Sequence, residues 1–171
     1  MTRPQPAPVL TAAPAHDVEV VIEDDRWRAL GDVADAVDRA VVALLASGAE
    51  GIDKLASATV LLSVDAHVAS LNTNFRGKPE PTNVLSFPAG PGAALPGETA
   101  YAGDVIIARE TVEREAGTLG VPVLHHLQHL AVHGLLHLIG YDHITTADAT
   151  VMETLETRVL ATLGIADPYA L

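Results

Sequence analysis

Three histidines between residues 133 and 143 have the spacing of a metal-binding site. His133 and His137 are four residues apart, so on a helix both imidazoles project from one face. Gly140 permits the left-handed backbone that turns a chain back, which lets His143 approach from a third side. Three imidazole nitrogens leave one tetrahedral position for a water molecule, an arrangement typical of catalytic zinc sites. The simplest alternative is a helix face whose histidines are only solvated.

The same spacing occurs in the zinc peptidase signature HExxHxxGxxH, with one difference. Gly134 stands where these peptidases carry the glutamate that acts as general base. The site therefore keeps the metal ligands and lacks the group that activates water for amide cleavage. We expect a metal-dependent enzyme other than a peptidase, with one Zn²⁺ per chain, although three imidazoles would also accept nickel or copper.

Strands and helices alternate along the chain and must position these residues. Apolar and β-branched segments predict strands over 18–22, 58–64, 84–87 and 104–108. Helical spacing of apolar residues and the capping positions predict helices over 27–45, 65–76, 109–117, 121–138 and 146–163. Asp24 or Asp25 is the expected N-cap of the first helix, and Asp65 that of the second. This alternation predicts an α/β or α+β fold around one small sheet.

Length and composition predict one acidic domain. A chain of 171 residues suffices for a single core, and we expect a disordered Pro/Ala-rich tail over 1–16, one domain over 17–165 and a C-terminal tail over 166–171. The chain has no cysteine, which excludes thiolate chemistry. Its 10 basic and 22 acidic residues give a net charge of −12, so no broad basic surface attracts nucleic acid or membranes. Without an apolar membrane segment or a signal peptide, we expect a cytoplasmic protein.

Three segments of the chain form a recognisable set: HGLLHLIGYDH at 133–143, LNTNFR at 71–76 running into PTNVLSFP at 81–88, and GDVII at 103–107. Together they resemble the YbeY family of metal-dependent endoribonucleases, which mature ribosomal RNA in bacteria. The resemblance extends in consistent order over about 18–163. It implies a small mixed four-stranded sheet packed with about five helices, a zinc ion on the three histidines and single-stranded RNA as substrate.

Arg76 matches the functionally important arginine of that family. A guanidinium beside an open metal site can hold a phosphate with two hydrogen bonds and stabilise transition-state charge. The alternative is an arginine that only meets the dipole at a helix C-terminus. Lys78 is a second candidate for binding the RNA backbone. His129 can support a metal ligand through a hydrogen bond, contact RNA, or be a partly buried, hydrogen-bonded histidine of the helix. The predicted catalytic residues are Arg76, His133, His137 and His143, and the predicted substrate-binding residues are Arg76, Lys78 and His129.

Four further polar residues are weaker candidates for the site. Three of them have both a functional and a structural interpretation, and the fourth has only a structural one. Asp142 can orient a histidine or accept a proton, or it can satisfy amides in the turn. Asn83 and Ser86 can contact RNA or support the edge of a strand. Asp104 opens a buried strand, where we expect it to bond to nearby backbone.

The leading hypothesis from the resemblance is a zinc-dependent endoribonuclease specific for single-stranded RNA, acting in 16S rRNA 3′ end maturation and ribosome quality control. One alternative is a metallohydrolase of another ester or amide. Another is a non-catalytic ribosome-assembly factor with structural zinc. The net charge of −12 disfavours tight autonomous binding to RNA, so we expect docking through small-subunit ribosomal proteins or assembly factors.

Overall fold

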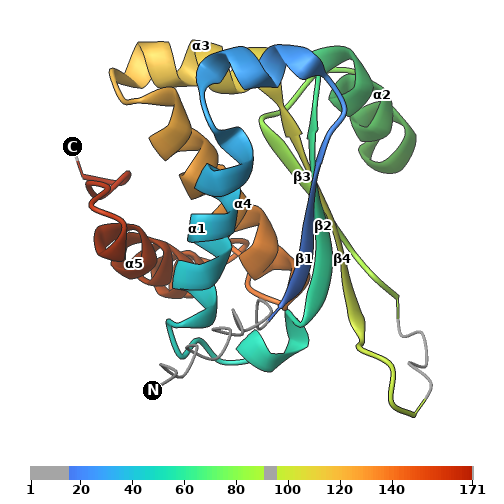
Figure 1. The fold of residues 1–171 in the computed structure, drawn as a ribbon, viewed down its shortest axis with the longest axis vertical. Helices are drawn as coiled ribbons and strands as arrows, with labels where there is room; N and C mark the ends of the chain where they lie inside the picture. The colour runs from blue at the N-terminus through green and yellow to red at the C-terminus, as the bar shows by residue number, and fades with distance from the viewer. Residues whose placement is uncertain (1–15, 91–95, 171) are drawn as a thin grey trace, which may run out of the picture.

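The computed structural model describes residues 16–90 and 96–170 of the chain. The predicted N-terminal tail therefore lies outside the described residues, except for His16. The sheet contains β1 (Asp17–Ile22), β2 (Ser57–Ser63), β3 (Val84–Pro88) and β4 (Tyr101–Ala108), in the order β1-β2-β4-β3. β1, β2 and β4 are parallel, and β3 is antiparallel to β4. The mixed four-stranded sheet is thus confirmed (Figure 1).

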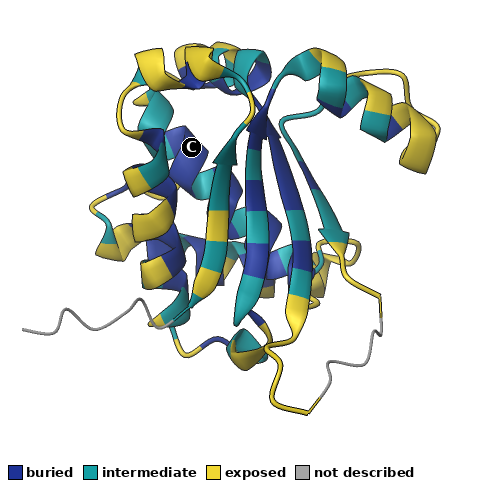
Figure 2. Ribbon diagram, turned by 45° about the vertical axis from the view of Figure 1, so that its right-hand side comes forward, coloured by how far each residue is buried: buried dark blue, intermediate teal, exposed yellow. Residues whose placement is uncertain are grey.

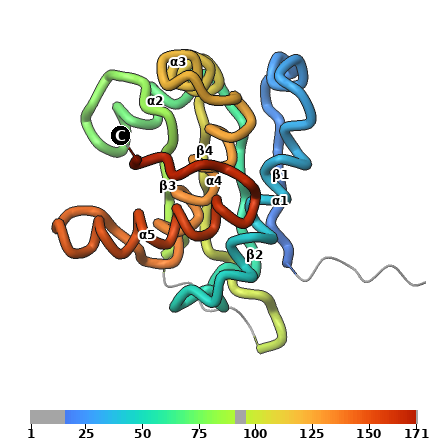
Figure 3. Tube along the Cα trace, turned by 90° about the vertical axis from the view of Figure 1, so that its left-hand side faces the viewer, coloured from blue at the N-terminus to red at the C-terminus, as the bar shows by residue number. Residues whose placement is uncertain are grey.

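Helices cover both faces of the sheet. The described α-helices are α1 (Val33–Leu45), α2 (Asp65–Arg76), α3 (Arg109–Leu119), α4 (Val123–Leu138) and α5 (Thr146–Thr162). α1 and α4 lie on one face, with α5 against them on the side away from the sheet, and α2 packs on the opposite face (Figures 1 and 3). None of the helices in residues 16–90 and 96–170 is long and apolar enough to cross a membrane.

α4 is the centre of the core. Alternate residues of β2 and β4, such as Leu62 and Ile107, are fully buried on the face that α4 covers. α4 itself has 10 of its 16 residues buried, because it contacts the sheet, α1, α3 and α5. Figure 2 shows buried and half-buried residues alternating along the central strands. A helix enclosed on so many sides is a rigid support for the side chains that it carries.

The prediction of one continuous helix over 27–45 is wrong, because this segment contains two separate helices. A short 3-10 helix, η1 (Asp25–Leu30), comes first, with Asp24 as its N-cap accepting from the Arg26 backbone N–H at 3.1 Å. Gly31 then takes a φ of 125°, which a helix cannot continue through. Asp32 begins α1 by accepting a hydrogen bond from the Asp35 N–H at 3.1 Å.

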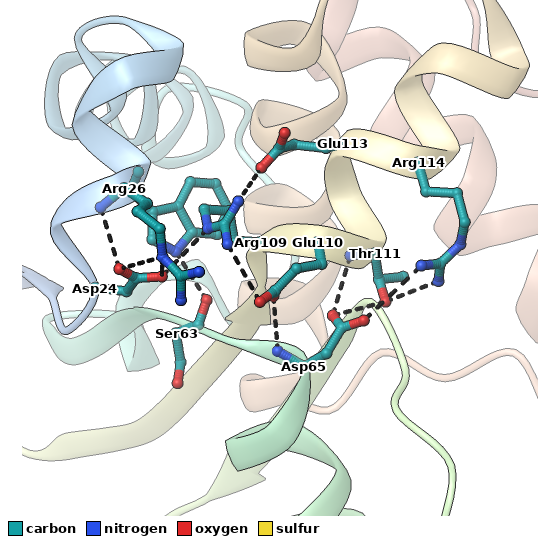
Figure 4. A network of polar contacts seen from close by, with 10 residues as sticks. Asp24, Arg26, Ser63, Asp65, Arg109, Glu110, Thr111, Glu113 and Arg114 are labelled. Carbon is teal, nitrogen blue, oxygen red and sulfur yellow. Dashed lines mark hydrogen bonds and ion pairs between the residues drawn. The ribbon is translucent and has the colours of Figure 1, made fainter.

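Asp65 is not the N-cap of α2 as predicted, but its first residue, with Val64 at the cap. Its carboxylate instead accepts the backbone N–H of Thr111 in α3 at 3.0 Å. In return, the Glu110 carboxylate accepts the backbone N–H of Asp65 at 2.9 Å. The N-termini of α2 and α3 therefore cap each other (Figure 4). This exchange fixes α2 against the rest of the fold, and Arg76 is the last residue of α2.

Candidate metal centre

His133 and His137 project from the last two turns of α4 toward the turn that follows it. Their Nε2 atoms are 3.1 Å apart. The ring of His143 lies over both, with centroid distances of 5.5 Å to His133 and 5.0 Å to His137. One nitrogen of each imidazole lies within 4.8 Å of the others, so the three side chains can hold one metal ion.

The turn after α4 is a Schellman motif, and it explains how His143 returns to the helix. Gly140 has a φ of 105°, its N–H donates to the His137 carbonyl, and the Tyr141 N–H donates to the Leu136 carbonyl. The carbonyl of Tyr141 in turn accepts the Nδ1–H of His137 at 2.9 Å. The glycine thus turns the chain back and places an acceptor that orients one of the histidines.

The Nδ1 atoms of both helical histidines have acceptors. His133 donates its Nδ1–H to the Glu156 carboxylate at 2.5 Å, as His137 does to the Tyr141 carbonyl. Both Nε2 atoms therefore carry lone pairs, and two such atoms at 3.1 Å repel each other unless a cation lies between them. Two nitrogens on a tetrahedral zinc ion are about 3.3 Å apart. The donor set therefore fits such a metal.

The electrostatics favour neutral imidazoles. Burial lowers the pKa of His137 below its usual 6.5, and the neighbouring His133 and His143 lower it further. Metals bind the neutral form of histidine. Burial raises the pKa of Glu156, but hydrogen bonds from His129 and His133 outweigh this effect and hold the pKa at about 2. Glu156 is therefore a carboxylate at neutral pH.

An open cleft of about 680 Å³ lies in front of the three histidines. It is lined by Arg76, by residues of the 82–88 segment, by the three histidines and by the 140–144 turn. Arg76 is exposed, and its side chain forms no ion pair or hydrogen bond with any residue of 16–90 or 96–170. Its guanidinium is therefore available to a ligand in the cleft.

The structure brings four of the predicted site residues together and places two elsewhere. Arg76, His133, His137 and His143 all line the cleft. Lys78 is exposed beyond the end of α2 and is not among the residues that line it. His129 faces a separate hollow of about 300 Å³, next to the C-terminal segment 165–170.

The other polar candidates are bonded within the protein. Asn83 and Ser86 line the cleft, but Asn83 donates to Glu115 at 3.0 Å and Ser86 donates to the Gly134 carbonyl at 2.9 Å. Asp142 accepts the His143 N–H at 2.7 Å, which shapes the turn. Asp104 accepts the Tyr101 hydroxyl at 2.5 Å, where we expected a backbone partner.

Glu156 and Tyr169 were missed by the sequence reasoning. Glu156 has no exposed surface and lies between His129 and His133. Tyr169, in the segment predicted as a C-terminal tail, donates its hydroxyl to Glu156 and packs edge-on against the His129 ring. One signal was present, because Glu156 interrupts the apolar face of α5 formed by residues such as Leu155 and Val159. A carboxylate at a core position of a helix needs polar partners.

The chain is similar to known proteins over most of its length. The family model described as Endoribonuclease YbeY matches residues 22–164, which include the whole cleft. An endoribonuclease YbeY of Rhodopseudomonas palustris is 52% identical over 155 residues, or 89% of each chain. One from Ruegeria pomeroyi is 47% identical and covers 90% of this chain and 98% of its own. A solution structure of a Thermotoga maritima protein, 20% identical, covers 90% of this chain and 99% of its own with a TM-score of 0.49.

Proposed function

Because the chain belongs to the endoribonuclease YbeY family, we propose that it is a zinc-dependent endoribonuclease that cuts single-stranded RNA during ribosomal RNA maturation. Family membership makes it a hydrolase that acts on RNA. The proposal of zinc-dependent cleavage of single-stranded RNA rests on one observation, which is that three imidazoles and one guanidinium line a single cleft. A metal ion and an arginine are the two kinds of positive charge that phosphoryl transfer most often uses.

The histidines and Arg76 have different roles in the proposed reaction. His133, His137 and His143 hold the metal through ring nitrogens, a set that suits zinc in a chain without cysteine. Bound zinc supplies Lewis-acid stabilisation of charge on a phosphoryl oxygen. Arg76 lines the same cleft and binds the same phosphate, because its planar fork matches two phosphate oxygens. Phosphoryl transfer depends mainly on such positioning and charge stabilisation, which need no glutamate at residue 134.

Unpaired RNA is the substrate that suits this cleft. A single strand can bend a phosphate into a small opening, whereas an A-form duplex presents a wide and stiff surface. With a net charge of −12, the protein has little general attraction for RNA. We therefore propose that ribosomal proteins of the small subunit, or assembly factors, bring it to the 3′ end of 16S rRNA and to defective ribosomes.

The test is cleavage by the purified protein of three substrates: a labelled single-stranded RNA, the same RNA as a duplex, and casein. We expect cleavage of the single strand only, abolished by a chelator and restored by zinc. The matched variants are His137→Ala, which removes a ligand, and His125→Ala, which removes a histidine of the same helix outside the cleft. RNA cleavage that survives in His137→Ala, or cleavage of casein alone, contradicts the proposal.

A test in cells separates this reading from a non-catalytic assembly factor. We expect His137→Ala to leave unprocessed 16S rRNA in cells that depend on it. Full ribosome maturation with that variant would favour the assembly factor.

A further inference from the structure

Glu156 is an ionised group in the core that the proposed reaction does not use. It lies on the face of α5 that packs against α4, among Met152, Leu155, Val159 and Leu160, and none of its surface is exposed. A buried carboxylate is costly unless hydrogen bonds replace its hydration, and an apolar residue would serve packing as well. The position therefore requires an explanation beyond the packing of α5.

Three side chains bond to this carboxylate. His133 donates Nδ1–H to Oε1 at 2.5 Å, and His129 donates Nε2–H to Oε2 at 3.3 Å. The Tyr169 hydroxyl donates to Oε2 as well. The donors come from α4 and from the segment after α5, which crosses over α4 (Figure 3) and packs Tyr169 against the His129 ring. Oε2 is thus held by two partners, and Oε1 is left to His133 alone.

We infer that Glu156 is a positioning residue for the metal centre and that Tyr169 holds it in place. By accepting the Nδ1 proton, Glu156 fixes the His133 tautomer that has an unprotonated Nε2, and it fixes the plane of the ring. That Nε2 faces Nε2 of His137 at 3.1 Å. A carboxylate on Nδ1 also makes Nε2 more basic and therefore a stronger ligand. This inference rests on the proposed function, because it requires that the metal binds to Nε2 of His133.

The two helical ligands are oriented by different means. His137 donates to a backbone carbonyl, which no substitution removes, whereas His133 depends on one side chain of another helix. The metal affinity is therefore sensitive to α5 and to the C-terminal segment, although neither lines the cleft.

A second arrangement of ligands uses the same residues. Nitrogens of His129 and His133 and a carboxylate oxygen of Glu156 also lie within 4.8 Å of one another. An ion shared by His133 Nδ1 and Glu156 would hold these atoms about 3.3 Å apart. In the structure Glu156 accepts the Nδ1–H of His133, and this bond leaves Nε2 of His133 free to share an ion with His137 and His143, so we assign Glu156 to positioning and not to metal binding.

The experiment measures zinc affinity by competition with a chromophoric chelator, without RNA. Glu156→Leu removes the acceptor, and we expect the Kd for zinc to rise about 10–100-fold. Tyr169→Phe removes one donor, and we expect a smaller rise. The double variant should bind zinc no more weakly than Glu156→Leu, because Tyr169 acts through Glu156. The matched control is Glu153→Gln, a carboxylate one turn earlier on α5 that has no hydrogen bond to residues 16–90 or 96–170.

Two readouts distinguish positioning from a merely structural role. The metal-free Glu156→Leu protein leaves three donors without their acceptor and should unfold at a lower urea concentration than the parent, so the zinc affinities are compared only under conditions in which circular dichroism shows both proteins to be folded. In the metal-free parent, the ¹⁵N signals of His133 should show protonated Nδ1 and bare Nε2. In Glu156→Gln, which keeps an acceptor without the charge and serves if the leucine variant fails to fold, zinc should bind more weakly while this tautomer persists.

The measurements distinguish a failure of the proposed metal centre from a failure of the positioning role of Glu156. A parent protein that binds no zinc overturns the metal centre itself, and with it the proposed function. A parent that binds one zinc ion, with Glu156→Leu and Glu156→Gln both within twofold of its Kd, overturns only the positioning role. Two zinc ions per parent chain, falling to one in Glu156→Leu, would make Glu156 a ligand and overturn the inference as well.

Discussion

A Cβ atom on residue 134 would lie 2.5 Å from Cγ1 of Val105, so α4 can pass this close to β4 only because residue 134 is Gly134. The same close approach lets the Gly134 carbonyl accept the Ser86 hydroxyl of β3 at 2.9 Å. Residue 134 thus faces the sheet and not the cleft. The glutamate of zinc peptidases has no room here, which is a structural reason for the glycine beside His133.

We predict that Gly134→Ala destabilises the protein. Alanine gains up to about 1 kcal/mol of helix propensity over glycine. The clash with the fully buried Val105 costs about 1–3 kcal/mol and outweighs that gain. Urea unfolding would measure the loss, and Val105→Ala in the same chain should relieve part of it. A Gly134→Ala protein as stable as the parent would contradict the close packing. Gly134→Glu should lose stability further and gain no peptidase activity.

Local patterns in the sequence predict most of the fold. The apolar run at 58–64 predicts the buried strand β2, and the helices end where Gly77 and Gly140 adopt left-handed backbone. The break at Gly31 was not predicted, because apolar spacing continues across it from Trp27 to Val33. Periodicity describes which residues are buried, and it cannot separate two helices that bury the same face.

The site was predictable where its residues are neighbours in the sequence. His133, His137 and His143 follow from helical spacing and one glycine. Arg76 lies 57 positions before His133, and only the family resemblance suggested that it faces the same cleft. The apolar face of α5 marks Glu156 as an exception, but its contacts and those of Tyr169 with α4 depend on how α5 and the segment after it pack, which no local pattern encodes.

Asp24 should stabilise the folded protein at neutral pH and lose this effect as the pH falls. Hydrogen bonds from Arg26, and a further one from Arg109, lower the pKa of Asp24 from 3.8 to about 2. A depressed pKa stabilises the folded state above the unfolded value and ceases to do so as the pH falls through the folded value. We expect Asp24→Asn to be less stable than the parent at pH 7, with the difference disappearing between about pH 4 and pH 2. Urea unfolding at several pH values measures this, and a difference that persists at pH 2 would count against it.

Removal of one histidine should remove the metal. Elemental analysis of His137→Ala should give metal content near zero, against one ion per chain in the parent. Zinc at 100 times its Kd should raise the free energy of unfolding of the parent by about 2.7 kcal/mol and leave His137→Ala unchanged. His125→Ala serves as the control, because it lies on the same helix and does not line the cleft. Full metal content in His137→Ala would remove the basis of the site.

Lys78 and Arg76 should differ in what they do for RNA. Lys78 lies outside the residues that line the cleft, so we expect it to contact a phosphate at a distance from the reaction. Lys78→Ala should weaken binding and reduce the slope of log K against log salt by about 0.7, the value for one contact on a single strand. The rate constant under saturating RNA should stay the same. A large fall in kcat would instead place Lys78 in the catalytic machinery.

Arg76 should be required for the chemical step and not for the fold. Its side chain is exposed and has no partner within residues 16–90 and 96–170, so Arg76→Lys should unfold at the same urea concentration as the parent. Lysine keeps the charge but loses the planar fork that holds two phosphate oxygens. If the fork stabilises the transition state, kcat should fall by about 10²-fold while zinc affinity is unchanged. Arg39→Lys, an exposed arginine of α1 away from the cleft, is the matched control. Unaltered kcat in Arg76→Lys would return Arg76 to the lesser role of a cation at the end of a helix.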